Sequence, residues 1–291
     1  MIGVSPAYFI SRFTDEFTPS DVAQGLQEIA DMGCRGFQLE VFHRRTIELW
    51  LKGGSQKVRQ RANDLGLTPT QFVAHFMMSS FAAPEMLLSD RGPAEMQAVL
   101  EIVGRFEACR IITLPLGRFE TPAVISAENY RAYFMRGVEK IGRLLEMVEN
   151  AGCQLALEIM PTALIGGTEG FLRLCDVLGT VSLGLNFDTG HAWAAKENLN
   201  LIPAKLGRRI LGTHLCDNFG HENLSLRPGA GSIDWRGVLA GLKASGYRGS
   251  FDIEIICQPE AVAREYRNGR IFIETILNRA DVSPENPGLP G

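Results

Sequence analysis

Four residues of types that commonly bind metal ions each close a separate short apolar run in the C-terminal half of the chain. They are Glu158, Asp188, His214 and Glu254, which lie 30, 26 and 40 residues apart. Apolar runs of this length between turn signals are typical of buried parallel strands, and each spacing matches one strand-helix-strand unit. Because neighbouring strand ends converge, the sequence predicts that three carboxylates and one imidazole meet at one point.

Such a cluster requires a counter-charge. Carboxylates gathered in a mostly apolar setting repel one another and lose hydration, and a bound divalent cation removes both penalties. The oxygen-rich set favours manganese, magnesium or cobalt, and zinc also fits. The sequence therefore predicts one divalent cation held by these four side chains.

The elements that must position the cluster alternate between strand-like and helix-like patterns eight times. The expected strands lie near Gly3–Ile10, Gly36–Val41, Gln71–Phe76, Arg110–Leu114, Gln154–Met160, Ser182–Asp188, Ile210–Leu215 and Ser250–Ile256. Amphipathic stretches between them include Ser20–Met32, Thr46–Leu65, Pro93–Ala108, Asn129–Asn150 and Trp235–Ser245. Eight such units predict an α/β fold, a single (β/α)8 TIM barrel over residues 1–282, with its active site at the C-terminal strand ends. Residues 283–291 are expected to form a disordered tail.

A weak internal repeat supports this architecture. Gly33, Gly152 and Gly246 each stand where a helix is expected to end, and each is followed by a strand that closes on a glutamate. Glycine is the residue that most readily caps a helix in the left-handed conformation. The repeat therefore predicts three equivalent helix-to-strand connections.

Composition and charge argue against several classes of function. The chain has 29 basic and 33 acidic residues, so it lacks the basic surplus of proteins that grip a phosphate backbone. Its six cysteines are scattered without a CxxC pair, as in reduced proteins. No signal-like segment opens the chain, and no apolar run approaches membrane-spanning length. We expect a soluble cytoplasmic protein without nucleic-acid or membrane partners. The oligomeric state stays open, with a homo-oligomer paired through exposed helices as one outcome.

Four sequence strings carry a resemblance to a known family. They are Leu157–Pro161 (LEIMP), Asn186–Ala192 (NFDTGHA), Gly212–Asn218 (GTHLCDN) and Arg227–Trp235 (RPGAGSIDW). In this order and spacing, the chain resembles the sugar phosphate isomerase/epimerase family, which includes ketose 3-epimerases, hydroxypyruvate isomerases and inosose dehydratases. That family shares the xylose isomerase-like barrel with class II apurinic endonucleases. The resemblance covers nearly the whole chain. It implies that the same four residues hold one divalent metal, and that His191 sits beside the substrate.

The chain departs from the endonuclease branch, which binds three metal ions through further histidines and an aspartate. The fourth-strand histidine of that branch is replaced by the run Thr113-Leu114-Pro115, and its Asp-x-His motif by Asn223-Leu224-Ser225. Asparagine and serine are poor replacements for a carboxylate and an imidazole as ligands. The single site shared with the sugar enzymes is intact, while a contribution of His221 to a second site stays open.

A cation in this setting can bind a ketone oxygen and an adjacent hydroxyl, and so acidify the C–H bond between them. Glu158 and Glu254 would then flank the carbon, one removing a proton and the other delivering it. His191 would stabilise the oxyanion. The wider set of expected substrate contacts is Arg227 as a donor to a distal hydroxyl or phosphate, and Trp193, Phe76 and Phe42 as apolar walls. Glu40 and His75 each have two interpretations, a substrate contact or an ordinary structural residue.

The predicted function is a divalent-metal-dependent isomerase or epimerase that converts a ketose or related hydroxy-ketone through an enediolate. A small-molecule keto-sugar or polyol ketone is the expected partner. The enzymatic alternative is a lyase or dehydratase acting on a keto-sugar or inosose, because an enediolate can also expel a leaving group. More distant alternatives are an apurinic-endonuclease-like phosphodiesterase and a non-catalytic sugar-binding subunit.

Overall fold

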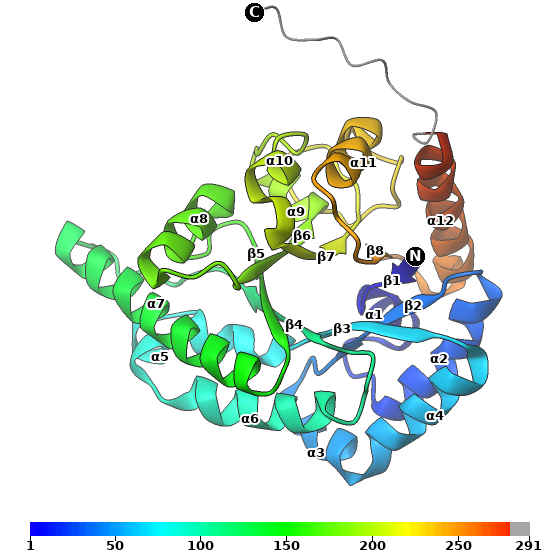
Figure 1. Ribbon diagram of the computed structural model, residues 1–291, viewed down its shortest axis with the longest axis horizontal. Helices are drawn as coiled ribbons and strands as arrows, with labels where there is room; N and C mark the ends of the chain where they lie inside the picture. The colour runs from blue at the N-terminus through cyan, green and yellow to red at the C-terminus, as the bar shows by residue number, and fades with distance from the viewer. Residues whose placement is uncertain (280–291) are drawn as a thin grey trace, which may run out of the picture.

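Eight parallel strands form a barrel in the computed structural model, which describes residues 1–279 (Figure 1). The strands are β1 (Ile2–Val4), β2 (Gly36–Glu40), β3 (Thr68–Val73), β4 (Ile111–Leu116), β5 (Gln154–Ile159), β6 (Gly184–Asp188), β7 (Ile210–His214) and β8 (Phe251–Ile253). Strands β1 to β7 each pair with the next strand along the chain, and β1 also pairs with β8. Leu215 closes the remaining seam between β7 and β8: its N–H donates to Asp252 O at 2.8 Å, and its carbonyl accepts from Glu254 N at 3.0 Å. The predicted (β/α)8 barrel is confirmed.

Helices surround the barrel on its outer side (Figure 1). They are α1 (Ala7–Phe13), α2 (Pro19–Asp31), α3 (Ile47–Leu49), α4 (Ser55–Leu65), α5 (Pro84–Leu88), α6 (Arg91–Val103), α7 (Ala127–Asn150), α8 (Gly167–Leu178), α9 (Thr189–Ala194), α10 (Ile202–Leu206), α11 (Trp235–Ala244) and α12 (Val262–Arg279). Short 3-10 or π turns add Arg44–Thr46, Trp50–Gly54, His75–Phe81, Gly207–Arg209 and Pro259–Ala261. Within residues 1–279, no helix has the length and apolar character needed to cross a membrane.

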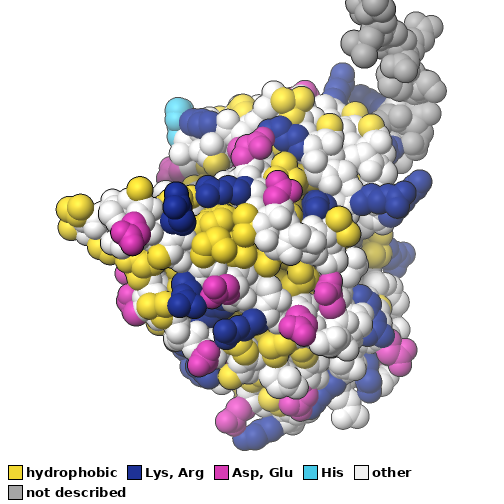
Figure 2. Space-filling model, turned by 60° about the vertical axis from the view of Figure 1, so that its left-hand side comes forward, with side chains coloured by type: hydrophobic (Ala, Val, Ile, Leu, Met, Phe, Trp, Pro, Cys, Tyr) yellow, Lys and Arg dark blue, Asp and Glu magenta, His cyan; other side chains and the backbone are white. Residues whose placement is uncertain are grey.

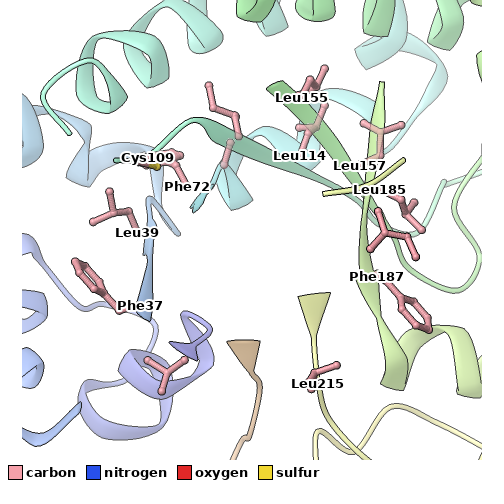
Figure 3. Packing of buried hydrophobic residues seen from close by; sticks show 14 of the residues in the cluster. Phe37, Leu39, Phe72, Cys109, Leu114, Leu155, Leu157, Leu185, Phe187 and Leu215 are labelled. Carbon is pink, nitrogen blue, oxygen red and sulfur yellow. The ribbon is translucent and has the colours of Figure 1, made fainter. Parts of the chain in front are cut away.

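The strands alternate between an apolar outer face and a polar inner face. Phe37, Leu39 and Phe187 point away from the barrel axis toward the helices (Figure 3) and are buried. The residue between the first two, Gln38, faces the interior, as expected from the two-residue period of a strand. Gln71 on β3 likewise donates to Asn186 Oδ1 on β6 at 3.0 Å, across the barrel. Helix packing thus uses one set of residues and leaves the other set free for chemistry.

The first and third strands end earlier than predicted. The apolar run Gly3–Ile10 was predicted to be one strand, but β1 ends at Val4 and α1 begins at Ala7. Pro6 explains the change, because its fixed φ suits the first turn of a helix. The run Gln71–Phe76 also divides: β3 ends at Val73, and a 3-10 helix begins at His75. Both breaks lie at the C-terminal end of the barrel.

Other expectations from the sequence agree with the structure more closely. Gly33, Gly152 and Gly246 have φ values of 84°, 70° and 80°, as the predicted helix caps require. The stretch Thr46–Leu65 is helical but kinked, since Gly53 has a φ of 116°. The predicted tail, residues 283–291, lies outside the described residues.

One outer face carries basic, acidic and hydrophobic side chains interspersed with one another (Figure 2). Apolar side chains before and within the first half of α7 are exposed, including Val124 at 85% and Met135 at 40%. The first turns of α7 project beyond the neighbouring helices (Figure 1). A homo-oligomer formed through such helices stays a prediction.

Candidate metal centre

The four predicted ligands come together at the C-terminal end of the barrel. Glu158, Asp188, His214 and Glu254 each offer a ligand atom, and these atoms all lie within 4.8 Å of one another. His214 Nδ1 lies 2.6 Å from Glu158 Oε1, 3.0 Å from Glu254 Oε2 and 3.8 Å from Asp188 Oδ2. The strands fix this arrangement, because Asp188 and His214 are direct register partners on β6 and β7. Glu158 is the penultimate residue of β5, which neighbours β6, and Glu254 directly follows β8, which neighbours β7.

The cluster is electrostatically unbalanced without a cation. Although burial opposes protonation, the Glu158 and Glu254 carboxylates raise the pKa of His214 well above its ordinary value. Burial also raises the pKa of Asp188, to about 7, and the nearby Glu254 and Glu158 carboxylates add to the shift. Protons on these two groups therefore offset part of the negative charge of the cluster. A divalent cation would offset that charge without leaving an acid group protonated.

An unpartnered oxygen supports the fit. Asp188 Oδ2 is buried without a hydrogen-bond partner, whereas Asp188 Oδ1 accepts from His191 N at 2.7 Å. A buried carboxylate oxygen normally has a partner, and here the oxygen faces the other three candidate ligands. Three carboxylates and one imidazole suit a hard or borderline divalent ion. The residues present thus fit the cation that the sequence predicts.

His191 lies beside the cluster, held by a tight turn after β6. Asp188 caps α9, and a side chain at Gly190 would collide with Asn223 and Cys216. His191 Nδ1 lies 3.4 Å from Asn223 Nδ2, and His191 Nε2 lies 3.9 Å from Asp188 Oδ2. Because the asparagine amide donates, Nδ1 accepts and Nε2 carries the hydrogen. The imidazole therefore presents an N–H group next to the four candidate ligands.

A cavity of about 100 Å³ opens beside the cluster. Its lining residues are Pro6, Ala7, Ile10, Glu40, Val73, His75, Glu158, Met160, His191, His214, Glu254 and Ile256. His75 stacks on Phe42 with ring centroids 4.1 Å apart, and its Nδ1 lies 3.6 Å from Glu40 Oε1. Glu40 Oε2 is buried without a hydrogen-bond partner, and burial raises the pKa of Glu40 well above its ordinary value. Glu40 and His75 thus form a polar wall of the cavity.

Arg227 and Trp193 do not line this cavity. The Arg227 side chain pairs with Glu265, with 3.2 Å between Nε and Oε2. Trp193 donates from Nε1 to Ser232 Oγ at 3.1 Å, and so fastens the loop that follows β7. The substrate contacts predicted for these two residues stay predictions. In the structure, Arg227 and Trp193 each contact another residue of the protein.

Sequence reasoning missed part of the surroundings of the cluster. Pro6, Ala7 and Ile10 line the cavity because the chain turns into α1 where a strand was expected. Gln38 and Asp252 were also overlooked, although Gln38 Oε1 lies 2.8 Å from His214 Nε2. The only sequence signal for these two residues was their position inside apolar runs. A polar residue in a buried strand needs a polar partner, so each of them must have one.

Comparison with known proteins supports the architecture. A family model described as the xylose isomerase-like TIM barrel matches residues 26–275. The chain belongs to this family. A D-psicose 3-epimerase crystallised with D-fructose has a similar structure, with a TM-score of 0.75 at 14% identity over 94% of this chain and 98% of that one. For a 3-keto-D-glucoside 4-epimerase of E. coli the TM-score is 0.72 at 17% identity, with the same two coverages.

Two curated relatives match part of this xylose isomerase-like barrel. An inosose isomerase of Bacillus velezensis is 24% identical over 178 residues, which are 56% of this chain and 61% of that protein. An uncharacterised protein of Methanocaldococcus jannaschii is 32% identical over 119 residues, which are 39% of this chain and 41% of that protein. The chain thus spans less than two thirds of either relative. Among the similar structures, an IOLI protein contains a zinc atom, at a TM-score of 0.70 and 15% identity over 96% of both chains.

The cation content of this xylose isomerase-like barrel tests the predicted single metal site. Protein purified without chelator should hold close to one equivalent of divalent cation, and His214→Ala should lower that content sharply, because a nitrogen ligand is lost. Elemental analysis measures both values. His43→Ala is the control: His43 belongs to a second, more exposed acidic group with Asp15 and Glu16, and its loss should leave the content unchanged. Three equivalents per chain would contradict the single site.

Proposed function

We propose that this protein is a divalent-metal-dependent isomerase or epimerase of a ketose or related hydroxy-ketone. The observation that carries the proposal is the placement of two glutamates. The carboxylates of Glu158 and Glu254 contact the same nitrogen of His214, at 2.6 and 3.0 Å, and both residues line the cavity. Two carboxylates at one cavity can act as an acid and base pair on one carbon.

When bound, the cation would polarise a substrate carbonyl and acidify the neighbouring C–H bond. Manganese, magnesium or cobalt suits the oxygen-rich ligand set, and zinc also fits. Glu158, Asp188, His214 and Glu254 would hold it. The sugar epimerases and the inosose isomerase among the similar proteins support a small keto-sugar or polyol ketone as the substrate class.

The protein's own residues then carry the proton transfer. One glutamate removes the α-proton, which leaves an enediolate, and the other glutamate, protonated, returns a proton to the opposite face or to the adjacent carbon. The first outcome inverts a stereocentre, and the second moves the carbonyl. His191 donates its Nε2 hydrogen to the developing oxyanion. Glu40 and His75, on the wall of the cavity, contact the substrate hydroxyl groups.

Deuterium exchange tests this proposal. A panel of keto-sugars and inososes is incubated with the cation-loaded protein in deuterated buffer and followed by NMR. We expect one substrate to gain deuterium at the carbon next to its carbonyl and to yield an epimer or isomer. Failure of every substrate to exchange would count against the proposal and would favour a non-catalytic sugar-binding subunit.

A dehydratase is the second candidate, favoured by one observation. Glu40 is a buried acid group in the cavity, and burial raises its pKa, so it is suited to donate a proton to a leaving hydroxyl group. The same NMR experiment separates the two reactions, because a dehydratase would release water and leave an unsaturated product. The phosphodiesterase alternative predicts nicking of a plasmid that contains abasic sites.

A further inference from the structure

The second ring nitrogen of His214 is held by a buried chain of polar side chains. His214 Nε2 lies 2.8 Å from Gln38 Oε1, and Gln38 Nε2 lies 2.9 Å from Asp252 Oδ2. Gln38 is on β2 and Asp252 on β8, so this row of hydrogen-bonded side chains crosses the barrel interior. All three residues are at most 2% exposed. In such a setting, each polar group needs a partner of the right kind.

Chemistry fixes the direction of each hydrogen bond. Asp252 accepts from Thr70 Oγ1 at 2.9 Å and from Ser250 Oγ at 2.6 Å, in addition to Gln38. Because this carboxylate acts as an acceptor, Gln38 must turn its NH₂ group toward it. The glutamine carbonyl then faces His214, and a carbonyl can only accept. His214 Nε2 must therefore carry a hydrogen.

A hydrogen on Nε2 determines the state of the other ring nitrogen, Nδ1. In a neutral imidazole with a hydrogen on Nε2, the free lone pair is on Nδ1, the atom that lies 2.6 Å from Glu158 and 3.0 Å from Glu254. That lone pair is what a cation would bind. The hydrogen bond from His214 Nε2 to the Gln38 carbonyl also makes the imidazole a stronger electron donor to a cation.

We propose that Gln38 is a positioning residue that fixes the tautomer and ring orientation of His214 for cation binding, with Asp252 fixing the Gln38 amide. The inference rests on the proposed function only in requiring a cation at this cluster. It assigns to the N-terminal half of the barrel, which supplies none of the four candidate ligands, a part in holding the cation.

Gln71 provides a matched control. It is also a buried glutamine that faces the barrel interior, on the next strand, β3. Its amide donates to Asn186 Oδ1 at 3.0 Å, and its carbonyl accepts from Thr113 Oγ1 at 2.5 Å. Replacing Gln71 therefore removes a comparable buried amide but leaves the hydrogen bond to His214 in place.

The experiment titrates zinc and manganese ions into chelator-treated protein by calorimetry. Gln38→Met should bind both ions roughly 10- to 100-fold more weakly than the parent, the usual cost of losing such a partner. Gln71→Met should bind them with the parent affinity. Equal affinity in Gln38→Met and the parent would overturn this inference and leave the proposed function standing. A parent protein that binds neither ion would overturn both.

A second measurement avoids any variant that fails to fold. NMR of the zinc-loaded parent, with ¹⁵N in its histidine rings, should show His214 with a hydrogen on Nε2 and zinc on Nδ1. The opposite pattern, with zinc on Nε2, would show that the hydrogen bond to Gln38 is broken in the loaded protein and would overturn the inference.

Discussion

Glu158→Gln and Glu254→Gln should each lower turnover by roughly 10²- to 10⁴-fold at saturating cation, the range expected when a positioned proton-transfer group is lost. Glutamine keeps the size of the side chain and one ligand oxygen but cannot exchange a proton. Both residues line the cavity, and both contact His214 Nδ1. A steady-state assay on the substrate found by deuterium exchange gives turnover, and a cation titration shows when the site is saturated.

Glu95→Gln is the matched control for these two substitutions. Glu95 is a buried glutamate on α6 that pairs with Arg91 and accepts from Ser80 Oγ, and it does not line the cavity. Its replacement should lower the thermal stability while leaving turnover close to that of the parent. Near-normal turnover in either cavity variant at saturating cation would rule out the two-glutamate mechanism.

His191→Ala should keep the fold and the cation content but lose roughly 2–4 kcal/mol of transition-state stabilisation, the usual scale for one oxyanion donor. The structure supports an effect on catalysis without an effect on cation binding. The Asn223 amide donates to His191 Nδ1, which leaves the Nε2 hydrogen beside the cluster. The change in kcat/KM gives the energy, and elemental analysis gives the cation content.

His221→Ala is the companion variant, since His221 is exposed on the loop after β7 and is the remaining candidate for a second site. It should alter neither activity nor cation content. A fall in cation content in His191→Ala, below that of the parent, would mean that His191 is itself a ligand and that the centre holds more than one ion.

Residues at strand ends were the part of the site that the sequence could predict. A strand end is a fixed position in a parallel barrel, so Asp188 and His214 could be placed together from the apolar runs that precede them. The same argument applies to Glu158 and Glu254. Their convergence depends only on the order of the strands, and that order follows the chain.

Contacts across the barrel could not be predicted in this way. Gln38 and Asp252 meet because closure places β8 two strands from β2, and their partners cannot be deduced from a pattern of alternating residues. The pairing of Arg227 with Glu265 could not be predicted either, because it depends on how α12 packs, and Glu265 lies 38 residues further along the chain. The helix α1 was missed because a short apolar run suits a strand or a buried helix equally.

A cation held by the candidate ligands would join β7 to β8. Leu215 joins these strands through two hydrogen bonds, and the candidate ligands His214 and Glu254 stand on the two sides of that junction. An ion held by both would bridge the seam, so opening the seam would require its release. By thermodynamic linkage, the ion must then suppress local unfolding there, and anything that loosens the junction must weaken the ion's affinity by the same factor. Amide hydrogen exchange at Glu254 would thus report the occupancy of a site formed entirely by side chains.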